Sequence, residues 1–419
     1  MSAGTITHGY SPRDLLESQG MLDRAVEALS AVSQEATYST SDAALVNDLF
    51  GAALYVQTNL EANGYGSLPK IDRSGMNTTA EQPLPLTFRA AHSPPALQST
   101  GEGANIPDGR TYSTEEVSAG IKQSEAVIEQ THLQQVRAEI LDGVPFDELT
   151  IVDELFQELA IDRYGVMAAV SSGNGGYSSR TKITELDRII ASGGEETNAQ
   201  DTSDTDLTDG DLDVYDIDRS SDSWADAYVD FTSDGTVRQL TETLVDSFLE
   251  QYFDFGSASR ENVYILTGRD TARVLGELQS DSTDGVQAVV NYDPEDIGRD
   301  SVEDAETVMG LPTMTKSRHY KGIPIVPSQH APQDSLSRIY MLPTDEITVP
   351  TPDGGTMQVP RIAVEELRTP HYEELTDQNP QNAPYLSRGK KENAAYYLMD
   401  HEVVARDFSA LGKLRDLQE

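Results

Sequence analysis

The stretch that decides the fold is FDELTIVDELFQELAIDRYGVMAAV, residues 146–170, which is followed by SSGNGG at 171–176. Its apolar residues recur at intervals of three and four, and its acidic residues occupy the opposite face. This spacing predicts one long amphipathic helix from Phe146 to Val170. The glycines after Ser172 are expected to end it, because glycine readily adopts the left-handed backbone geometry of a helix C-terminus. We therefore interpret the glycine-rich loop as a helix end and not as a ligand-binding loop.

On the C-terminal side of this helix lies a strongly acidic segment, residues 191–234, with 14 acidic residues and one base, Arg219. We interpret this segment as a solvated acidic loop. A calcium-binding EF-hand with Gly210 at its sixth position would need acids or amides at Thr205 and Leu207, and neither residue fits. Loose binding of cations by the segment stays open.

Beyond the acidic segment, helix and strand patterns alternate. Amphipathic spacing predicts a helix at 236–253, and the apolar run at 263–266 predicts a buried strand followed by a helix to about residue 279. Further strands are predicted at 286–292, 323–326, 339–342, 361–367 and 394–406, and the chain is expected to close with a helix. This order of elements indicates an α+β fold.

On the N-terminal side of the long helix the chain has the pattern of arms. Two short helices are predicted, one beginning at Ser11-Pro12 and one over 41–60, and each needs a neighbour to bury its single apolar stripe. Residues 76–111 contain five prolines and little periodicity, which favours a two-stranded, extended arm over a compact loop. Residues 125–140 have the pattern of a helix.

The balance of charge is extreme. The 419 residues carry 71 acidic and 30 basic side chains, for a formal charge of −41, and only eight of the bases are lysines. A surface of carboxylates with few lysines suits molar salt, where the Debye length is about 3 Å and self-repulsion is screened. We expect a protein of an extreme halophile's cytoplasm, or of a virus that replicates there. A moderately salty or ordinary acidic protein is the alternative.

The same charge excludes whole classes of partner. Such a chain cannot hold a nucleic-acid backbone by bulk attraction, and an anionic membrane surface would repel it. The sequence has no run of about 18 apolar residues that would predict a transmembrane helix. Its first residues, MSAGTITHGYSPRDLL, lack the pattern of a secretory signal. We therefore expect neither a membrane partner nor export.

The sequence contains no recognisable catalytic or metal-binding constellation. It has no cysteine, and its seven histidines are scattered without the spacing of a metal-binding pair. The phosphate loop, the dinucleotide fingerprint and the nucleophile-elbow serine are missing as well. We predict no catalytic residue, no metal ligand and no cofactor, and hence a protein that is not an enzyme. An acidic halophilic enzyme stays a distant alternative.

Residues 99–107, STGEGANIP, carry a resemblance to a family. This segment resembles the "glutamate-glycine, small residue, isoleucine-proline" segment in major capsid proteins of tailed double-stranded DNA viruses, the Hong Kong 97 phage type. In that family the segment precedes the returning strand of the extended loop, or E-loop. Residues 111–129, TYSTEEVSAGIKQSEAVIE, are similar to that strand and to the start of the helix that follows it.

Three further segments match the family in its order. Residues 146–176 resemble the spine helix and its glycine loop. NVYILTG at 262–268, leading into ARVLGEL at 272–278, resembles a strand and helix of the axial domain. GLP at 310–312, KGIPIVPSQHAP at 321–332 and RIYM at 338–341 resemble the hairpin near the end of that domain.

The resemblance implies a Hong Kong 97-type capsid fold in five parts. These are an N-terminal arm at 1–75, the E-loop at 76–122, a peripheral domain with the spine helix at 123–177, an axial domain at 178–358 with an acidic insertion at 191–234, and peripheral strands with the C-terminus at 359–419.

The function that the resemblance implies is structural. The subunit would self-assemble in the host cytoplasm, through pentamers and hexamers, into the icosahedral capsid of a virion that encloses double-stranded DNA without binding it strongly. Besides itself, the implied partners are scaffold, portal and cement or decoration proteins. An encapsulin-like protein nanocompartment, which shares the fold, is the alternative.

The resemblance also assigns inter-subunit contacts to the E-loop and the N-terminal arm. The residues expected to be buried against a neighbouring subunit are Leu15, Leu22, Leu84, Leu86, Phe88, Ile106 and Tyr112. No lysine lies between Lys70 and Lys122, so the covalent crosslink that the founding phage forms through an E-loop lysine is not expected. The long N-terminal scaffolding segment of some relatives is missing too, so we expect a separate scaffold or prior removal of such a segment.

Overall fold

The computed structural model describes residues 62–73, 86–93, 113–131, 146–173, 175–281, 318–350, 355–374 and 392–419. Its internal contacts divide the chain into two units. One unit comprises residues 1–59, 125–157 and 371–398, and the other comprises residues 60–124, 158–370 and 399–419. The candidate site described below lies entirely within the second unit.

The described helices, with short 3₁₀ and π segments marked η, are α4 (Asn63–Gly66), α6 (Phe146–Ile161), η1 (Asp162–Val166), η2 (Tyr177–Ser179), α7 (Leu186–Ile189), α8 (Gly193–Asn198), η3 (Ser223–Ala225), α9 (Glu242–Phe255), η4 (Arg260–Asn262), α10 (Arg269–Asp281) and η5 (Phe408–Ala410). The described strands are β1 (Lys70–Asp72), β2 (Leu86–Ser93), β3 (Ser113–Ala119), β4 (Lys122–Thr131), β5 (Tyr228–Asp230), β6 (Arg238–Gln239), β7 (Val263–Gly268), β8 (Arg318–Tyr320), β9 (Ile323–Ser328), β10 (Ile339–Pro343), β11 (Glu346–Pro350), β12 (Thr356–Pro360), β13 (Ile362–Glu374), β14 (Glu392–Ala405), β15 (Gly412–Leu414) and β16 (Leu417–Gln418). This mixture of helices and sheets confirms the α+β class.

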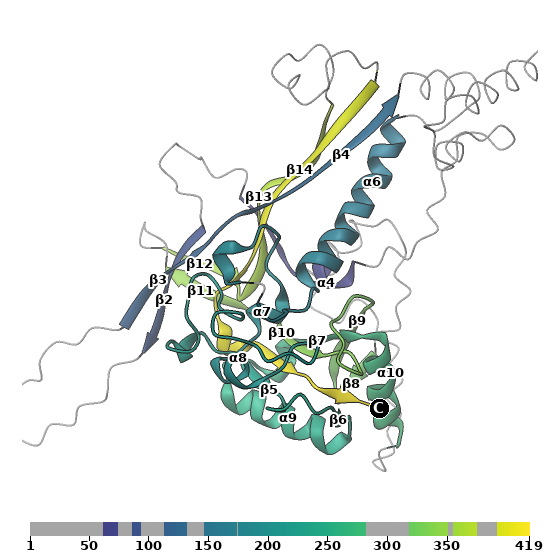
Figure 1. The fold of residues 1–419 in the computed structure, drawn as a ribbon. Coiled ribbons are helices and arrows are strands. Elements are labelled where there is room, and N and C mark those ends of the chain that lie inside the picture. Colours follow the sequence, from purple (N-terminus) through teal and green to yellow (C-terminus); the bar gives the residue numbers. More distant parts are fainter. Residues whose placement is uncertain are drawn as a thin grey trace, which may run out of the picture. The chain divides into compact units, whose positions relative to one another are not determined.

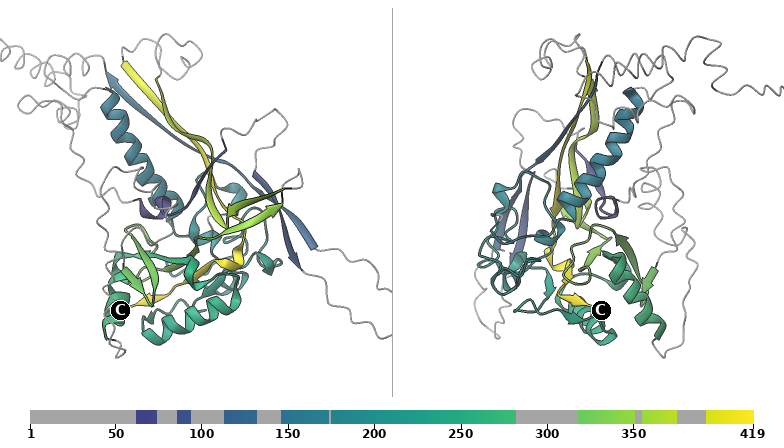
Figure 2. Two further views of the ribbon diagram at one scale, coloured as in Figure 1. Left: turned by 180° about the vertical axis from the view of Figure 1, so that it is seen from behind. Right: turned by 45° about the vertical axis from the view of Figure 1, so that its right-hand side comes forward.

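A six-stranded mixed sheet carries the main hydrophobic core of the second unit. Its strand order is β5-β15-β10-β7-β9-β8, with β10 antiparallel to β7 and β15, and with β7 parallel to β9. The central strands β7 (VYILTG) and β10 (IYMLP) are buried at every position, as short apolar runs in the middle of a covered sheet are. Apolar residues of α9 and α10 pack against this sheet (Figures 1 and 2).

The chain ends in two short strands, of which β15 belongs to this sheet and β16 to a separate two-stranded sheet, so the predicted closing helix is wrong. β15 pairs with β10 and β5, while β16 pairs with β6. Leu414 and Leu417 are fully buried, and their spacing of three is typical of a helix. The backbone turns between them at Asp416, where φ is +60°, so the two leucines reach the core from two separate short strands.

A second sheet has four strands in the order β1-β13-β14-β4. β4 occupies part of the region for which a helix was predicted, so that prediction is wrong for residues 125–131, and residues 132–140 lie outside the described ones. From Lys122 to Val127 the exposure of successive residues alternates, which is the period of a strand and not of a helix. The strands predicted at 361–367 and 394–406 are confirmed as β13 and β14.

Most other predicted elements are confirmed. The long helix is α6, and it continues as a π-helical turn to Val166. The predicted end at Val170 is wrong, and the glycines after Ser172 do not cap the helix, because the chain has already left it at Met167. The strand at 263–266, its following helix and the strands at 323–326 and 339–342 are β7, α10, β9 and β10. The helix predicted at 236–253 begins later, at Glu242, because the Thr241 side chain accepts a hydrogen bond from the Leu244 amide and caps it there.

Three predicted elements lie outside the described residues. They are the two N-terminal helices and the strand at 286–292. Within the part of the chain that the structure describes, no helix is both long and apolar enough to cross a membrane.

Candidate assembly interface

Strands β2 and β3 form an antiparallel hairpin and run side by side in Figure 1. Phe88 pairs with Val117, and Leu86 pairs with Ala119. Val117 and Ala119 are buried, Phe88 is half-buried, and the opposite end of β3 at Ser113 is exposed. As predicted, residues 86–93 form one strand of a two-stranded hairpin, but the second strand, at 113–119, lies beyond the predicted range of 76–111. Because an isolated two-stranded hairpin is only marginally stable in water, its orientation depends on how its buried end is held.

The Tyr177 hydroxyl holds that end of the hairpin. It accepts a hydrogen bond from the Gly120 amide at 2.7 Å and donates its single proton either to the Gly120 carbonyl at 3.3 Å or to Glu402 Oε2 at 3.2 Å. Tyr177 is 3% exposed, and its pKa is raised above the usual range by burial and by the nearby Glu402 carboxylate. The phenol therefore stays protonated and joins the hairpin to strand β14.

The Glu402 carboxylate is fully buried beneath this contact. Its Oε1 atom accepts hydrogen bonds from the backbone amides of Thr184, at 2.9 Å, and Val403, at 2.8 Å. Burial raises the pKa of Glu402 to about 7, against the effect of these donors and of Lys122, which lower it. A carboxyl group that titrates near neutral pH thus lies directly under the end of the hairpin.

Lys122 adds a second connection at the same point. Its ammonium donates a hydrogen bond to the Arg180 carbonyl at 2.7 Å and lies 4.6 Å from the centre of the Tyr177 ring. Burial lowers the pKa of this lysine, although Glu402 and Asp216 act to raise it. Tyr177, Glu402 and Lys122, which we call the hairpin anchor, fix the strand at the point where β3 passes into β4.

A buried ionic network lies deeper in the second unit. It consists of Asp187, Glu195, Arg338, Lys413 and Arg415, all of which are at most 2% exposed. Arg338 binds both oxygens of Asp187, at 2.9 and 2.8 Å, and Lys413 lies between Asp187 Oδ1 at 3.2 Å and Glu195 Oε1 at 2.8 Å. Arg415 binds the same Glu195 oxygen at 2.7 Å. The network ties α7 and α8 to β15 and to the start of β10.

Asp187 stays ionised in this network. Burial alone acts to raise its pKa, but Arg338, Lys413 and Arg415 together hold the pKa well below the usual range. The Val170 amide and the Tyr340 hydroxyl also donate hydrogen bonds to the carboxylate, each at 3.0 Å. Every polar atom that Asp187 presents is thus bound, which is the condition for a buried charge to be tolerated.

The acidic segment is not the solvated loop that was predicted. Glu195, Glu196, Asp201 and Asp211 are at most 5% exposed, and the first is part of the ionic network. Asp201 and Asp211 accept hydrogen bonds from the amides of Ser172 and Gly173, in the loop that follows the long helix. Part of the segment matches the prediction, since it has an exposed acidic loop at 203–206 with Asp209, and Asp216, Asp218 and Asp234 are exposed as well.

The single base of the acidic segment organises it. Arg219 is 1% exposed, and its guanidinium donates to five backbone carbonyls, those of Arg188, Ile189, Ala191, Leu212 and Ala225. Burial lowers the pKa of Arg219 to about 10, although nearby carboxylates such as Asp226 and Glu195 act to raise it. The segment therefore folds around this arginine, which explains why so many of its acids are enclosed.

The seven predicted contact residues are only partly located. Leu86 and Phe88 lie on β2, in the hairpin, where the prediction places them. Leu15, Leu22, Leu84, Ile106 and Tyr112 lie outside the described residues. No group of three or more potential metal-ligating side chains was found among the described residues.

Sequence reasoning missed the anchor and the ionic network. Tyr177, Glu402 and Lys413 belong to no motif, and each bonds to a residue more than 50 positions away in the sequence. The sequence contained one signal that the acidic segment is folded: it has a lone arginine, Arg219, among 14 carboxylates, which a solvated loop does not explain.

We compared the chain with family models, with curated proteins and with solved structures to identify its fold. No family model matches the chain, and no curated protein matches it in sequence. Among solved structures, the chain is similar to the capsid of a native GTA particle, with 13% identity and a TM-score of 0.51 over 91% of this chain and 100% of that one. It is also similar to a capsid chain of cyanophage A-1(L), with 12% identity and a TM-score of 0.58 over 91% of this chain and 99% of that one. The fold is that of tailed-phage capsid proteins, the Hong Kong 97 type. This bears out the fold class expected from the sequence, and at such low identity the likeness concerns the fold alone.

Proposed function

We propose that this chain is the major capsid protein of a tailed double-stranded DNA virus. It self-assembles through pentamers and hexamers into an icosahedral shell around the genome. The observation that carries the proposal is the anchored β2–β3 hairpin, set in a fold that matches two capsid structures, one of them from a cyanophage, over nine tenths of the chain. A hairpin that exposes its far end and is fixed at its root is suited to lie on a neighbouring subunit.

In this proposal the chain keeps the five parts inferred from the sequence. Residues 1–75 form the N-terminal arm, 76–122 the E-loop, 123–177 and 359–419 the peripheral domain, and 178–358 the axial domain. The contact residues Leu15, Leu22, Leu84, Leu86, Phe88, Ile106 and Tyr112 are buried only on assembly. A specific contact of this kind requires on the order of 1,000 Å² of buried surface.

The charge of −41 is the basis for proposing a haloarchaeal virus. In molar salt the Debye length is about 3 Å, so copies that repel one another at low salt can come into contact. The genome is retained by closure of the shell and by counterions rather than by strong direct binding. Scaffold, portal and decoration proteins are the proposed partners, assembly takes place in the host cytoplasm, and the subunit has a structural role without catalysis.

Electron microscopy of the purified chain in about 3 M salt tests the proposal. We expect closed icosahedral particles that loosen on dialysis to about 0.1 M salt, where the Debye length reaches about 10 Å. Nucleic acid in particles purified from infected cells separates a viral capsid from an encapsulin-like compartment, which holds protein cargo instead. A small, monodisperse oligomer that turns over a substrate would contradict the proposal and favour an acidic enzyme.

A further inference from the structure

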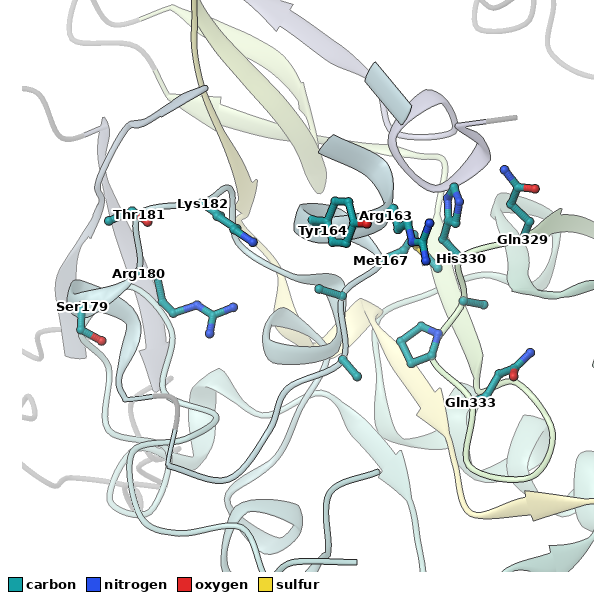
Figure 3. Close-up of a pocket in the computed structure, with 14 residues that line it drawn as sticks. Arg163, Tyr164, Met167, Ser179, Arg180, Thr181, Lys182, Gln329, His330 and Gln333 are labelled. Carbon is teal, nitrogen blue, oxygen red and sulfur yellow. The ribbon is translucent and has the colours of Figure 1, made fainter. Parts of the chain in front are cut away.

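A pocket of about 970 Å³ lies beside the end of the long helix, within the second unit. Its walls come from η1 and the residues that follow it, from the loop at 179–182 and from the turn at 329–333. Figure 3 shows Arg180 and Lys182 on one side of the open space and Arg163, Tyr164 and His330 on the other.

The lining of this pocket has the opposite charge to the chain as a whole. It contains Arg163, Arg180, Lys182 and His330 and no aspartate or glutamate, although the chain has 71 acids and 30 bases. Most bases elsewhere bind a carboxylate, as Arg361 binds Asp345 and Lys321 binds Asp246. Arg163 and Lys182 are exposed and form no ion pair with any carboxylate in the described ranges. The pocket is thus lined by basic side chains, although the molecule as a whole is strongly acidic.

Tyr164 holds these two cations in position. Tyr164 is 53% exposed, and the Arg163 guanidinium and the Lys182 ammonium lie 5.1 and 5.5 Å from the centre of its ring. Cations at such distances are attracted by the ring, at about 0.5–1 kcal/mol for an exposed site. Because the ring partly orders two long side chains, less conformational entropy is lost when they bind an anion.

Buried carboxylates fix the other basic side chains that line the pocket, His330 and Arg180. His330 Nδ1 lies 2.7 Å from Asp162 Oδ2, and Asp162 is fully buried. Arg180 forms an ion pair with the buried Glu185, while its carbonyl accepts the hydrogen bond from Lys122 of the hairpin anchor. The pocket wall and the hairpin anchor therefore share one backbone segment.

We propose that this pocket binds an acidic surface loop of a second copy of this chain, an inference that rests on the proposed capsid function. Copies of this chain carry the complementary charge in abundance, on loops that can enter a concave site, such as 203–206 with Asp209. Duplex DNA is a stiff rod with a persistence length of about 50 nm, so it cannot bend into a concave pocket as a surface loop can. Carboxylates of a neighbouring copy bind Arg163 and Lys182, and the contact is a local attraction between molecules that otherwise repel.

Charge reversal of the two unpaired bases tests the inference. The variant Arg163→Glu with Lys182→Glu is compared with Arg260→Glu with Arg273→Glu, which changes the net charge by the same amount at exposed bases outside the pocket. We expect the pocket variant to remain folded by circular dichroism but to require at least a tenfold higher concentration than wild type to form particles. The control variant is expected to assemble like wild type.

Carbodiimide crosslinking adds a direct readout, because it joins an amine to a carboxylate only when the two are in contact. In particles assembled from equal parts of ¹⁵N-labelled and unlabelled chains, we expect Lys182 to be linked to an aspartate or glutamate peptide of the other label.

Four results would contradict the inference. Pocket variants that assemble at the wild-type concentration overturn it and leave the capsid proposal intact, and so does the absence of any Lys182 crosslink between differently labelled chains. Duplex DNA binding that is lost in the pocket variant while assembly is unchanged assigns the pocket to nucleic acid instead. Wild-type chains that form no particles in any salt overturn the capsid proposal, and the inference with it.

Discussion

The buried ionic network and the exposed acidic loop place the same kind of side chain in opposite surroundings. Glu195 and the loop at 203–206 belong to one acidic segment, yet Glu195 is fully buried against Lys413 and Arg415 while the loop lies in solvent. A buried carboxylate is bound by short, unscreened contacts, whereas an exposed one acts mainly through long-range repulsion that salt removes. The charge of this chain therefore has two separate roles, one in holding the fold together and one in setting its response to salt.

The largest effect is expected from breaking the buried network. Asp187→Ala leaves Arg338 and Lys413 without their shared carboxylate, and removal of one partner of a buried ion pair typically destabilises a protein by about 3–5 kcal/mol. Denaturant unfolding in constant high salt measures the loss. Asp187→Asn, which keeps the shape of the side chain, is expected to lose somewhat less.

Asp209→Ala in the exposed acidic loop is the matched control. It removes the same carboxylate from a solvated position, so its free energy of unfolding should change by no more than about 0.5 kcal/mol. If Asp187→Ala and Asp209→Ala lowered the free energy of unfolding equally, burial would not determine how much a carboxylate contributes to stability.

The next largest effect concerns pH and the hairpin anchor. The pKa of Glu402 rises from an ordinary value of 4.5 to about 7 in the folded chain. Between these two values the folded state binds more protons than the unfolded state, so stability falls as pH rises through this window. At about 1.4 kcal/mol per pKa unit, the fall is up to about 3 kcal/mol.

Glu402→Gln should remove the share of the slope that Glu402 contributes, roughly half of what Glu402 and Glu196 contribute together, because both pKa values are raised to about 7. The amide oxygen can still accept from Thr184 and Val403, and the amide nitrogen can donate to the Tyr177 hydroxyl. Glu196, whose pKa burial also raises to about 7, keeps a share of the slope in this variant. Unfolding curves measured between pH 4.5 and 8 test the prediction, and an unchanged slope in Glu402→Gln would assign the dependence to other groups.

A smaller effect is expected when the anchor loses its hydroxyl. Tyr177→Phe leaves the Gly120 amide and Glu402 Oε2 without their shared partner, which costs about 1–3 kcal/mol. Relative to wild type, we expect amide hydrogen exchange in this variant to be faster at Gly120 and along β3 and unchanged in the core strand β7. Tyr228→Phe removes a hydroxyl whose bond to Gln251 is solvent-exposed, and it should leave exchange in the hairpin unchanged.

The sequence predicted those parts of the fold that depend on local periodicity. The helix from Phe146 and the apolar strand runs at 263–266 and 339–342 were found because each pattern is set by its own segment. Local pattern misled at residues 125–131 and at the C-terminus, where pairing with distant strands overrides a helical spacing. The hairpin was predictable as extended, but its anchor was not, because Tyr177 and Glu402 are 225 residues apart and their meeting depends on the whole fold.

The smallest effect distinguishes the two roles of charge most directly. Asp204→Asn with Asp209→Asn removes two exposed charges from the acidic segment, and asparagine is tolerated at residue 204, where φ is +57°. In about 0.1 M salt the variant should gain at most about 0.5 kcal/mol per site through relief of repulsion, and in about 3 M salt it should match wild type. Asp187→Asn should instead lose the same free energy of unfolding in both salts, since its partners are enclosed. If the free energies of unfolding of both variants changed with salt in the same way, the exposed and the buried carboxylates would have the same role. The distinction that we base on burial would then be wrong.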